Sequence, residues 1–278
     1  MLRHRVLGTI RVRPYATSSS PSEYSSQSRG GLPRFFSPVL PSANGGVVRI
    51  QGDEFFHMTK VLRLSADDRV ELFNGKGGLV SGIIGDIHRT GLDFTALEDP
   101  LLIDPLTPQW HVYAAFGTLK GGRADWLIEK CTELGASSVT PLLTQRSPSI
   151  SDNRVERLER VILAATKQCQ RLHEMRIHPP LDIANLAEQV QRSKLSFLAV
   201  AEAPPLLKVL TSQRDEPEGL IIIGPEGDFT EKESNILTEA GAAKVSLGQH
   251  RLRVETATVA LLATLMLWSD RNNQMIVD

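Results

Sequence analysis

The chain has 278 residues, 41% of them hydrophobic and 23% charged, which is close to the composition of an ordinary globular enzyme. This length allows one large or two modest domains with a well-buried core. Thirty-one basic residues face 32 acidic ones, so a protein that binds nucleic acid through a global positive field is excluded. Cys131 and Cys169 lie far apart without CxxC spacing, which favours neither a disulfide framework nor a zinc site. No stretch of the sequence reaches the roughly 18 uninterrupted apolar residues of a membrane span.

The first thirty residues differ in kind from the rest of the chain. They contain five arginines against a single acid, Glu23, and serines crowd positions 18–28 without an apolar segment after the basic start. This composition is typical of an organelle transit peptide, and Arg13-Pro14-Tyr15-Ala16 resembles a mitochondrial processing site with cleavage after Tyr15. We therefore expect residues 1–31 to be a transit peptide or disordered tail.

That segment predicts an organellar protein, in a chloroplast stroma or in mitochondria. The alternative is a tail that carries no address, on a cytoplasmic protein. Without the first thirty residues, 26 bases face 31 acids, so any contact with nucleic acid must come from local basic patches.

Residues 32–104 have the pattern of a small β-barrel. Turn residues separate several short β-type runs, and a helix is expected at 53–62 with Asp53 as its N-cap. The proline-rich stretch 100–108 then disfavours regular structure and marks a domain boundary. The expected strands are 47–51, 70–73, 79–86 and 92–97.

From residue 105 to 278, strand-like and helical patterns alternate, which predicts a largely parallel sheet covered by helices. Thr230 and Glu233 form a capping box, and Gly241 ends the helix that follows it. The apolar helix 255–268 suits either a core or a subunit interface. The expected strands are 112–116, 139–143, 195–201, 220–223 and 244–247, and the expected helices are 125–134, 154–173, 205–212, 231–240 and 255–268.

Two glycine-containing segments, 224–230 and 248–257, each lie between a short apolar run and the start of a helix. Helix N-termini offer unpaired N–H groups, and open α/β sheets bind ligands at the carboxyl ends of their strands. We therefore expect the two loops to build one ligand pocket.

Several familiar chemistries do not fit this pocket. The segment 117–124 nearly spells a phosphate-binding P-loop, but Arg123 and Ala124 stand where that loop needs Lys and Ser or Thr. No G-x-G-x-x-G fingerprint follows a strand, no G-x-S-x-G elbow is present, and the seven histidines lack metal-ligand spacing. By elimination, the pocket is expected to hold an uncharged or mixed-charge organic cofactor through backbone groups.

Basic residues recur on the expected helix 154–173, on a face separate from its apolar one. Such a row suits RNA phosphates, for which Arg is favoured, or it is a solvated face with Glu156 and Glu159 as partners. The row comprises Arg157, Arg160, Lys167 and Arg171, with Arg146, Arg154, Lys120 and Arg123 upstream.

Several segments resemble motifs of the RsmE family, in order, between residues 34 and 268. GPEGDFTEKE at 224–233 and LGQHRLRVETA at 247–257 resemble two signature motifs. RADWLIEKCTELG at 123–135 resembles a third motif, and Gln168 with Arg171 a fourth. Arg34-Phe35-Phe36 and His57 with Val61-Leu62-Arg63 match the N-terminal domain of the family.

This resemblance implies a fold and an activity. The fold would be α/β with a β-barrel: a PUA-like RNA-binding barrel at 32–104, then a SPOUT-type methyltransferase domain with a trefoil knot at 105–278. The enzyme would be a homodimer that methylates N3 of a uridine in small-subunit ribosomal RNA with S-adenosyl-L-methionine, without a metal or a membrane. A non-catalytic RNA-binding or ribosome-assembly factor that retains the fold is the alternative.

The resemblance also implies roles for individual residues. In this chain Asp228 replaces a glycine of the family pattern, and Arg251 and Val254 also depart from it; Asp228 is expected at a position that needs positive φ. The catalytic candidates are Arg253, Glu255 and Glu226, with capping of the last helix as the other role of Glu255. The cofactor-binding candidates are Glu202, Ile223, Gly224, Pro225, Gly227, Leu247, Gly248, Leu252, Arg253 and Thr256, with the glycines allowing backbone to approach the ligand. The RNA-binding candidates are Arg34, His57, Arg63, Lys120, Arg123, Arg146, Arg157, Lys167 and Arg171.

The N-terminal segment generates the first prediction. Because residues 1 to about 30 are expected to act only as an address, a chain that starts at Leu32 should match the full-length protein in stability and activity in vitro. A fluorescent fusion that lacks the segment should stay in the cytosol when imaged in cells. Import of that truncated fusion into an organelle would contradict the prediction.

Overall fold

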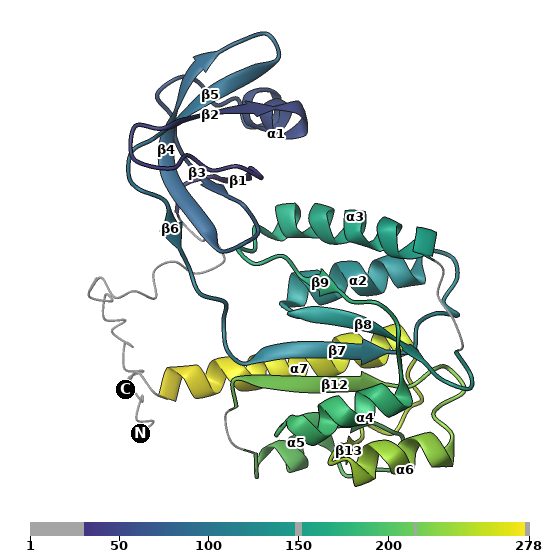
Figure 1. Ribbon diagram of the computed structural model, residues 1–278. Coiled ribbons are helices and arrows are strands. Elements are labelled where there is room, and N and C mark those ends of the chain that lie inside the picture. The colour runs from purple at the N-terminus through teal and green to yellow at the C-terminus, as the bar shows by residue number, and fades with distance from the viewer. Residues whose placement is uncertain (1–30, 148–151, 214–215, 276–278) are drawn as a thin grey trace, which may run out of the picture.

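A computed structural model describes residues 31–147, 152–213 and 216–275 of the chain. The predicted transit segment, except for its last residue, lies outside the described residues. Figure 1 shows a β-rich domain, here called the β domain, above a layered α/β domain. Strand β6 of the first domain ends at Leu102 and β7 of the second begins at Gln109, so the predicted boundary falls between them.

The β domain is a six-stranded sheet with the strand order β1-β3-β4-β5-β2, in which β6 pairs with β4. Phe35 on one edge strand and Ile50 on the other pack into the same buried core, so the sheet must curl around it. The sequence did not predict β1 and β6, which are too short to show alternation. The strands are β1 (Arg34–Phe36), β2 (Val47–Gln51), β3 (Arg69–Phe73), β4 (Gly78–Ile87), β5 (Gly91–Ala96) and β6 (Leu101–Leu102).

The expected helix 53–62 is in fact two short elements, α1 (Gly52–Phe56) and the π-helix η2 (His57–Val61). The N-cap is Gln51, which makes no side-chain capping bond, so the expectation for Asp53 is wrong. The wider π turn places Met58 fully inside the core while Phe56 stays 60% exposed.

The α/β domain contains the expected parallel sheet, with the order β10-β8-β7-β12-β11-β13 and β9 paired to β8. Ala199, Ile223 and Val245 are in register at the carboxyl ends of three neighbouring strands. The loops that follow these strands must therefore start at one level of the sheet. The strands are β7 (Gln109–Ala114), β8 (Ser138–Leu143), β9 (Arg176–Ile177), β10 (Leu181–Asp182), β11 (Ser196–Ala199), β12 (Glu218–Ile223) and β13 (Ala243–Val245).

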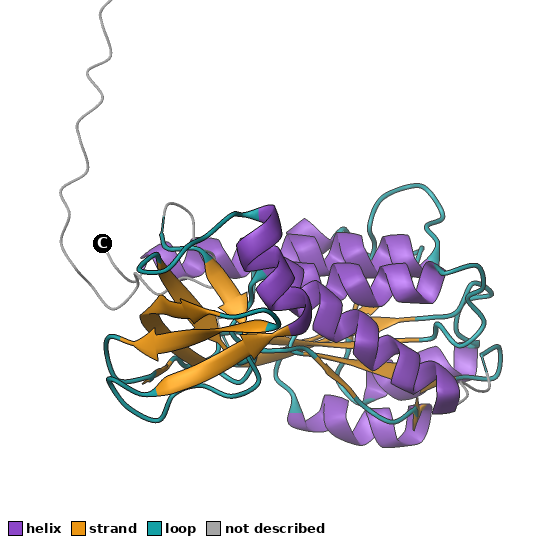
Figure 2. Ribbon diagram, turned by 90° about the horizontal axis from the view of Figure 1, so that it is seen from above, coloured by secondary structure: helices purple, strands orange, loops and turns teal. Residues whose placement is uncertain are grey.

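Helices cover both faces of this sheet, as Figures 1 and 2 show. Helices α2 (Arg123–Leu134), α3 (Asp152–Cys169) and α7 (Val254–Met275) pack through residues such as Leu127, Leu158 and Leu261 on one face. Helices α4 (Ile183–Arg192) and α6 (Glu231–Glu239) pack on the other face. The short helix α5 (Leu206–Leu210) joins the first of these two cores.

The β domain rests on the segment that follows α3. Gln170 has a φ of +56°, which ends the helix four residues earlier than predicted. Gly77 N then donates to Leu172 O at 2.8 Å, and Glu174 N donates to Gly75 O at the same distance. Buried Phe73, Leu79 and Leu172 fill the contact between the two domains.

Gly77 generates the second prediction, with Gly45 as a matched control. Both have left-handed φ, +88° and +78°, but a Cβ on Gly77 would lie 2.6 Å from Ile103 O, whereas a Cβ on Gly45 would meet nothing within 4 Å. Gly45→Ala should cost about 1 kcal/mol of backbone strain. Gly77→Ala should cost about 1–3 kcal/mol more because of overpacking. Urea unfolding of the two variants would measure the difference, and equal losses would contradict the prediction.

Candidate active site

A pocket lies where the carboxyl ends of β11, β12 and β13 meet, so the expected convergence of the two glycine loops is confirmed. Six of the predicted cofactor residues line it: Ile223, Gly224, Pro225, Leu247, Gly248 and Leu252. Also in the lining are Glu226, Asp228, His250, Arg251, Val254 and Ala257, together with Ala199, Val200, Ala201 and Val245.

The other four predicted cofactor residues are not part of this lining. All four are exposed and are next to lining residues in the sequence: Glu202, Gly227, Arg253 and Thr256. His250 belongs to the second predicted loop and Ala201 is next to Glu202, so the sequence pointed to both, whereas it did not indicate Ala199 and Val200 in β11 and just after it. The signal that could have found the β11 residues is the parallel pairing, which makes each strand end contribute to the same crevice.

The loop between β12 and α6 is a tight turn. Asp228 N donates to Pro225 O at 2.8 Å, and Asp228 has a φ of +66°, as its place in the motif predicts. Aspartate tolerates this conformation better than most residues, and its Oδ1 accepts a hydrogen bond from Phe229 N at 2.8 Å. The capping box of Thr230 and Glu233 then starts α6, as predicted.

The glycines of the two loops are needed for different reasons. Gly248 has a φ of +112°, and a Cβ there would meet nothing within 4 Å, so backbone conformation alone requires glycine. A Cβ on Gly224 would lie 2.9 Å from the ring of Phe229, and one on Gly227 would lie 2.9 Å from Arg146 Cδ. Packing against Phe229 therefore accounts for Gly224, whereas the contact at Gly227 is with the flexible side chain of Arg146, which can shift.

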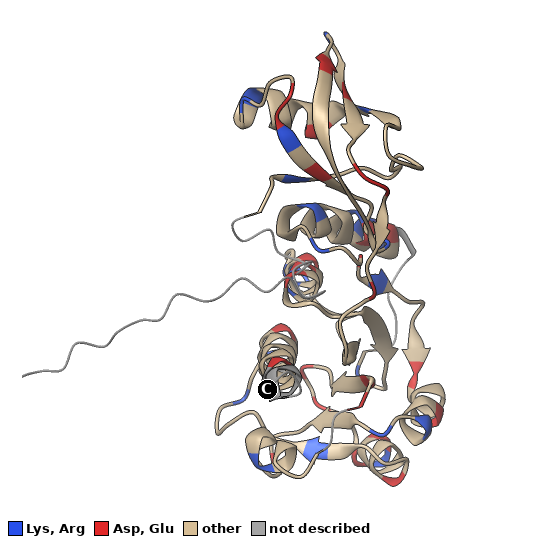
Figure 3. Cartoon of the chain, turned by 90° about the vertical axis from the view of Figure 1, so that its left-hand side faces the viewer, with Lys and Arg blue, Asp and Glu red and all other residues tan. Residues whose placement is uncertain are grey.

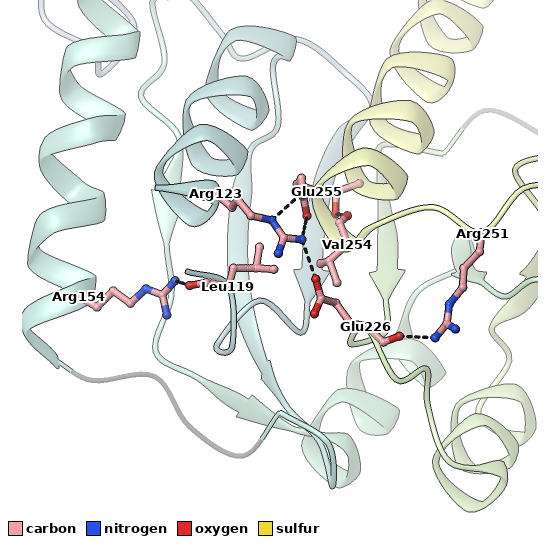
Figure 4. Close-up of polar contacts among 8 residues, drawn as sticks. Leu119, Arg123, Arg154, Glu226, Arg251, Val254 and Glu255 are labelled. Carbon is pink, nitrogen blue, oxygen red and sulfur yellow. Dashed lines mark hydrogen bonds and ion pairs between the residues drawn. The ribbon is translucent and has the colours of Figure 1, made fainter. Parts of the chain in front are cut away.

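Arg123, the first residue of α2, joins both predicted catalytic carboxylates at the edge of the pocket (Figure 4). Its Nε and Nη2 donate to the two oxygens of Glu255 at 2.8 and 2.9 Å, and Nη2 also donates to Glu226 at 2.7 Å. Arg123 was predicted as an RNA-binding cation, whereas here it is held by two acids. No sequence pattern indicates these pairs, because 132 and 103 residues separate the partners.

Glu255 lies in the first turn of α7 and is only 7% exposed. Burial by itself would raise its pKa, but hydrogen bonds from Arg123 and from the backbone N–H of Glu255 outweigh burial and lower the pKa. The hydrogen bonds that Arg123 donates, first to Glu255 and then to Glu226, raise the pKa of Arg123. Glu255 is therefore ionised at neutral pH, and its lowered pKa makes it a weak proton acceptor. An ion pair at a helix N-terminus thus suits it better than the role of general base.

The basic row on α3 is not the continuous face that the sequence predicted. Arg171 lies beyond the end of the helix and donates to Thr132 O and Ala136 O at 2.7 and 3.0 Å. Lys167 pairs with Glu54 at 3.4 Å in the contact with the β domain, and Arg157 pairs with Asp125. Figure 3 shows the basic residues spread over the molecule among acidic ones.

The other RNA-binding candidates differ in exposure. Arg34 pairs with Glu71 at 2.9 Å and its side chain is 4% exposed, so it is poorly placed for a phosphate. His57 contacts the edge of Phe35, with 5.8 Å between ring centroids. Arg63 and Lys120 are exposed, and Arg63 has a φ of +57°.

Two further arginines hold the loop 225–228 by its backbone. Arg146, which follows β8, donates through Nη1 to Gly227 O and, at 3.2 Å, to Asp228 O. Arg251, which follows β13, donates to Glu226 O (Figure 4).

The described residues contain no group of three or more His, Cys, Asp or Glu side chains placed to hold a metal ion. Among the same residues, none of the helices combines the length and apolar character needed to cross a membrane.

Comparison with known families gives two matches along the chain. A family described as "RNA methyltransferase domain" matches residues 106–266, and one described as "RNA methyltransferase PUA domain" matches residues 50–97.

Curated relatives agree with these matches. Ribosomal RNA small subunit methyltransferase E of Synechocystis sp. is 31% identical over 218 residues, which are 76% of this chain and 70% of that protein. The protein of the same name from Rickettsia conorii is 29% identical over 227 residues, which are 81% of this chain and 91% of that protein.

Solved structures have the same fold. A probable rRNA methyltransferase from Porphyromonas gingivalis has a TM-score of 0.73 at 26% identity, covering 87% of this chain and 100% of that one. Ribosomal RNA small subunit methyltransferase E from Neisseria gonorrhoeae, bound to S-adenosyl methionine, has a TM-score of 0.67 at 23% identity, covering 85% of this chain and 97% of that one.

The ion pair of Arg123 and Glu255 generates the third prediction. The pKa of Glu255 in the folded protein lies below its ordinary value of 4.5, so the pair stabilises the fold above about pH 4.5 and loses this effect as pH falls through the folded pKa. In Arg123→Gln, burial would instead raise the pKa of Glu255, so the variant should be less stable than wild type at neutral pH. The difference should shrink as pH falls below the ordinary pKa of Glu, because the carboxyl group is protonated first in the variant and, once pH passes the lowered folded pKa, in wild type as well.

Urea unfolding over this pH range would measure the effect. The matched control is Arg192→Gln, because Arg192 is 79% exposed and pairs only at 3.6 Å with Glu188, which is 66% exposed. An exposed pair of this kind contributes little, so its removal should change stability equally at all these pH values. A pH-independent loss in Arg123→Gln would show that the ion pair is not its cause.

Proposed function

We propose that this chain, which belongs to the RsmE family of ribosomal RNA small-subunit methyltransferases, transfers the methyl group of S-adenosyl-L-methionine to N3 of a uridine in small-subunit ribosomal RNA. One observation carries the proposal: the two loops that resemble the family's signature motifs form one pocket at the ends of β11, β12 and β13. The convergence of these loops supports a single site at which cofactor and target base meet.

The lining of the pocket fits this cofactor. Leu247, Leu252 and Val254 offer apolar surface to an adenine ring, and the neighbouring backbone groups can hydrogen-bond to its edge. Glu226 and Asp228 add acidic groups, which suit a ligand with a positive sulfonium and a positive amino group. When bound, the cofactor supplies an activated methyl group. The protein then has to hold the uracil ring in line and assist loss of its imide proton.

Glu226 and Arg253 are the residues we assign to this task. Glu226 lines the pocket with a side chain that is 52% exposed, so its carboxylate can reach a base that enters from solvent. Glu255 is nearly buried and fully engaged with Arg123, so it is the poorer proton acceptor. Arg253 is exposed at the start of α7, where its charge can stabilise a developing anion on a uracil oxygen.

The assembly and the chain topology are part of the proposal. We propose a homodimer with its pockets near the subunit interface and a trefoil knot in the α/β domain, as the family resemblance implies. Exposed apolar side chains on two adjacent helices support the interface, since Trp126 on α2 is 44% exposed and Leu267 on α7 is 72% exposed.

We further propose that the enzyme acts in an organelle, on the ribosomal RNA or small ribosomal subunit of that compartment. The arginine- and serine-rich composition of the first thirty residues supports this location. A target in single-stranded or loop RNA would cost less to unstack than one in a duplex.

Methyl transfer to small-subunit ribosomal RNA tests the function, and it is our fourth prediction. Purified protein with methyl-labelled cofactor should place label on N3 of a uridine, as located by mass mapping of the RNA. Binding of RNA without transfer of label would instead support the non-catalytic assembly factor.

Two glycine variants locate the cofactor site by their effect on cofactor affinity. Gly248 and Gly241 have similar φ, +112° and +117°, and a Cβ on either would meet nothing within 4 Å, but only Gly248 lines the pocket. Gly248→Asn and Gly241→Asn should therefore share their backbone strain, while only the first fills space meant for the cofactor. Calorimetry should show a loss of at least about tenfold in cofactor affinity for Gly248→Asn alone. Equal affinities in the two variants would contradict the assignment of the pocket.

A further inference from the structure

Guanidinium groups approach the loop 225–228 from different sides of the fold. Arg146 reaches Gly227 O and Asp228 O from the loop after β8, and Arg251 reaches Glu226 O from the loop after β13. Three successive carbonyl groups therefore accept hydrogen bonds from arginines. Figure 4 shows Arg251 on the opposite side of Glu226 from Arg123.

The charges of these arginines are balanced differently. Arg123 is neutralised by the carboxylates of Glu226 and Glu255. Within the part of the chain that the structure describes, no ion pair within 4.0 Å involves Arg146 or Arg251. Both hold the loop through backbone oxygens. Arg146 also interacts electrostatically with Glu233, but the carboxylate of Glu233 accepts hydrogen bonds from Gln145 N and Thr230 N, so both arginines still present positive charge at the rim of the pocket.

Both arginines also have hydrogen-bonding capacity to spare. A guanidinium carries five N–H donors, whereas the contacts with the loop use Nη1 of Arg146 and Nη2 of Arg251. Both side chains are exposed, so the remaining donors face solvent. Arg251 itself lines the pocket, and Arg146 lies just outside it against Gly227.

An exposed guanidinium that makes no ion pair suits a phosphodiester, because its planar donors match two phosphate oxygens. A polynucleotide whose base enters the pocket must lay its backbone across the rim. We propose that Arg146 and Arg251 bind the RNA phosphates on either side of the target nucleotide, while holding the loop that lines the cofactor pocket. This inference rests on the proposed function and adds the contacts that position its RNA.

A purely structural role of Arg146 and Arg251 predicts different results. If the arginines only hold the loop, their loss should weaken cofactor binding and leave the ionic-strength dependence of RNA binding unchanged. If they bind phosphates, their loss should weaken RNA binding and reduce its salt dependence, by a log–log slope of about 0.7 for each single-strand contact removed.

The experiment is our fifth prediction and compares Arg146→Gln, Arg251→Gln and the double variant with Arg192→Gln, an exposed arginine on α4 outside the pocket lining. Fluorescence anisotropy with a labelled fragment of small-subunit ribosomal RNA, over a series of salt concentrations, gives affinity and slope. Each single variant should lose roughly tenfold in RNA affinity and the double variant roughly a hundredfold, with lower slopes. Arg192→Gln should match wild type.

Cofactor affinity and thermal unfolding, measured on the same proteins, separate the alternatives. For Arg146→Gln, which lies outside the pocket lining, the proposal expects cofactor affinity within about threefold of wild type, because the loop keeps its bonds from Arg123 and Arg251 and its own turn. Arg251→Lys keeps the positive charge, so this variant should retain most of the salt dependence of RNA binding. Unchanged RNA affinity and slope in the double variant, or weaker cofactor binding with an unchanged slope, would overturn the proposal. A wild-type protein that binds RNA and cofactor but transfers no methyl group would contradict only the proposed function.

Discussion

The parallel pairing of β12 between β7 and β11 is the constraint on which the rest of the site depends. Ile221 and Ile222 are fully buried and point to opposite faces of the sheet, so one core on each side fixes the register of this strand. The register then sets Ala114, Ile223 and Ala199 at one level. A slip of one residue would exchange the two faces and separate the loops that form the pocket.

Arg123 links this sheet edge to two elements that the sheet does not hold directly. Its guanidinium joins the start of α2 to the start of α7 through Glu255 and to the loop after β12 through Glu226. The carboxylate of Glu255 is nearly buried, and a buried charge is costly unless it is paired. The pair therefore specifies one relative placement of two helices and the pocket loop, while Arg146 and Arg251 hold the same loop from other sides.

The sequence predicted the regular parts of this arrangement because their patterns are local. Short apolar runs followed by glycine and a capping box predict strand, turn and helix, and the structure has all three at Ile223, Gly224 and Thr230. Helix α4 was missed although Asp182 caps it and Leu186 and Val190 have helical spacing. The N-cap and the apolar spacing of α4 are therefore both visible in the sequence.

Other features depend on contacts that no local pattern shows. The end of α3 at Cys169 is set by Gln170 in a left-handed conformation, which glutamine seldom adopts. The β domain docks there and favours that backbone through Leu172. The pairing of Arg123 with Glu255 likewise arises only after the sheet has formed. Helical periodicity alone therefore placed Arg171 on a face that does not exist.

Helix α3 also connects the region of the pocket to the β domain. Its N-terminal end lies near the pocket, because Arg154 donates to Gly117 O in the loop after β7, and Arg146, which precedes the helix, donates to Gly227 O. Its C-terminal end carries the β domain through Lys167. Eighteen residues at about 1.5 Å each make this helix about 27 Å long. One end of α3 therefore lies near the pocket, and the other, about 27 Å away, lies against the β domain.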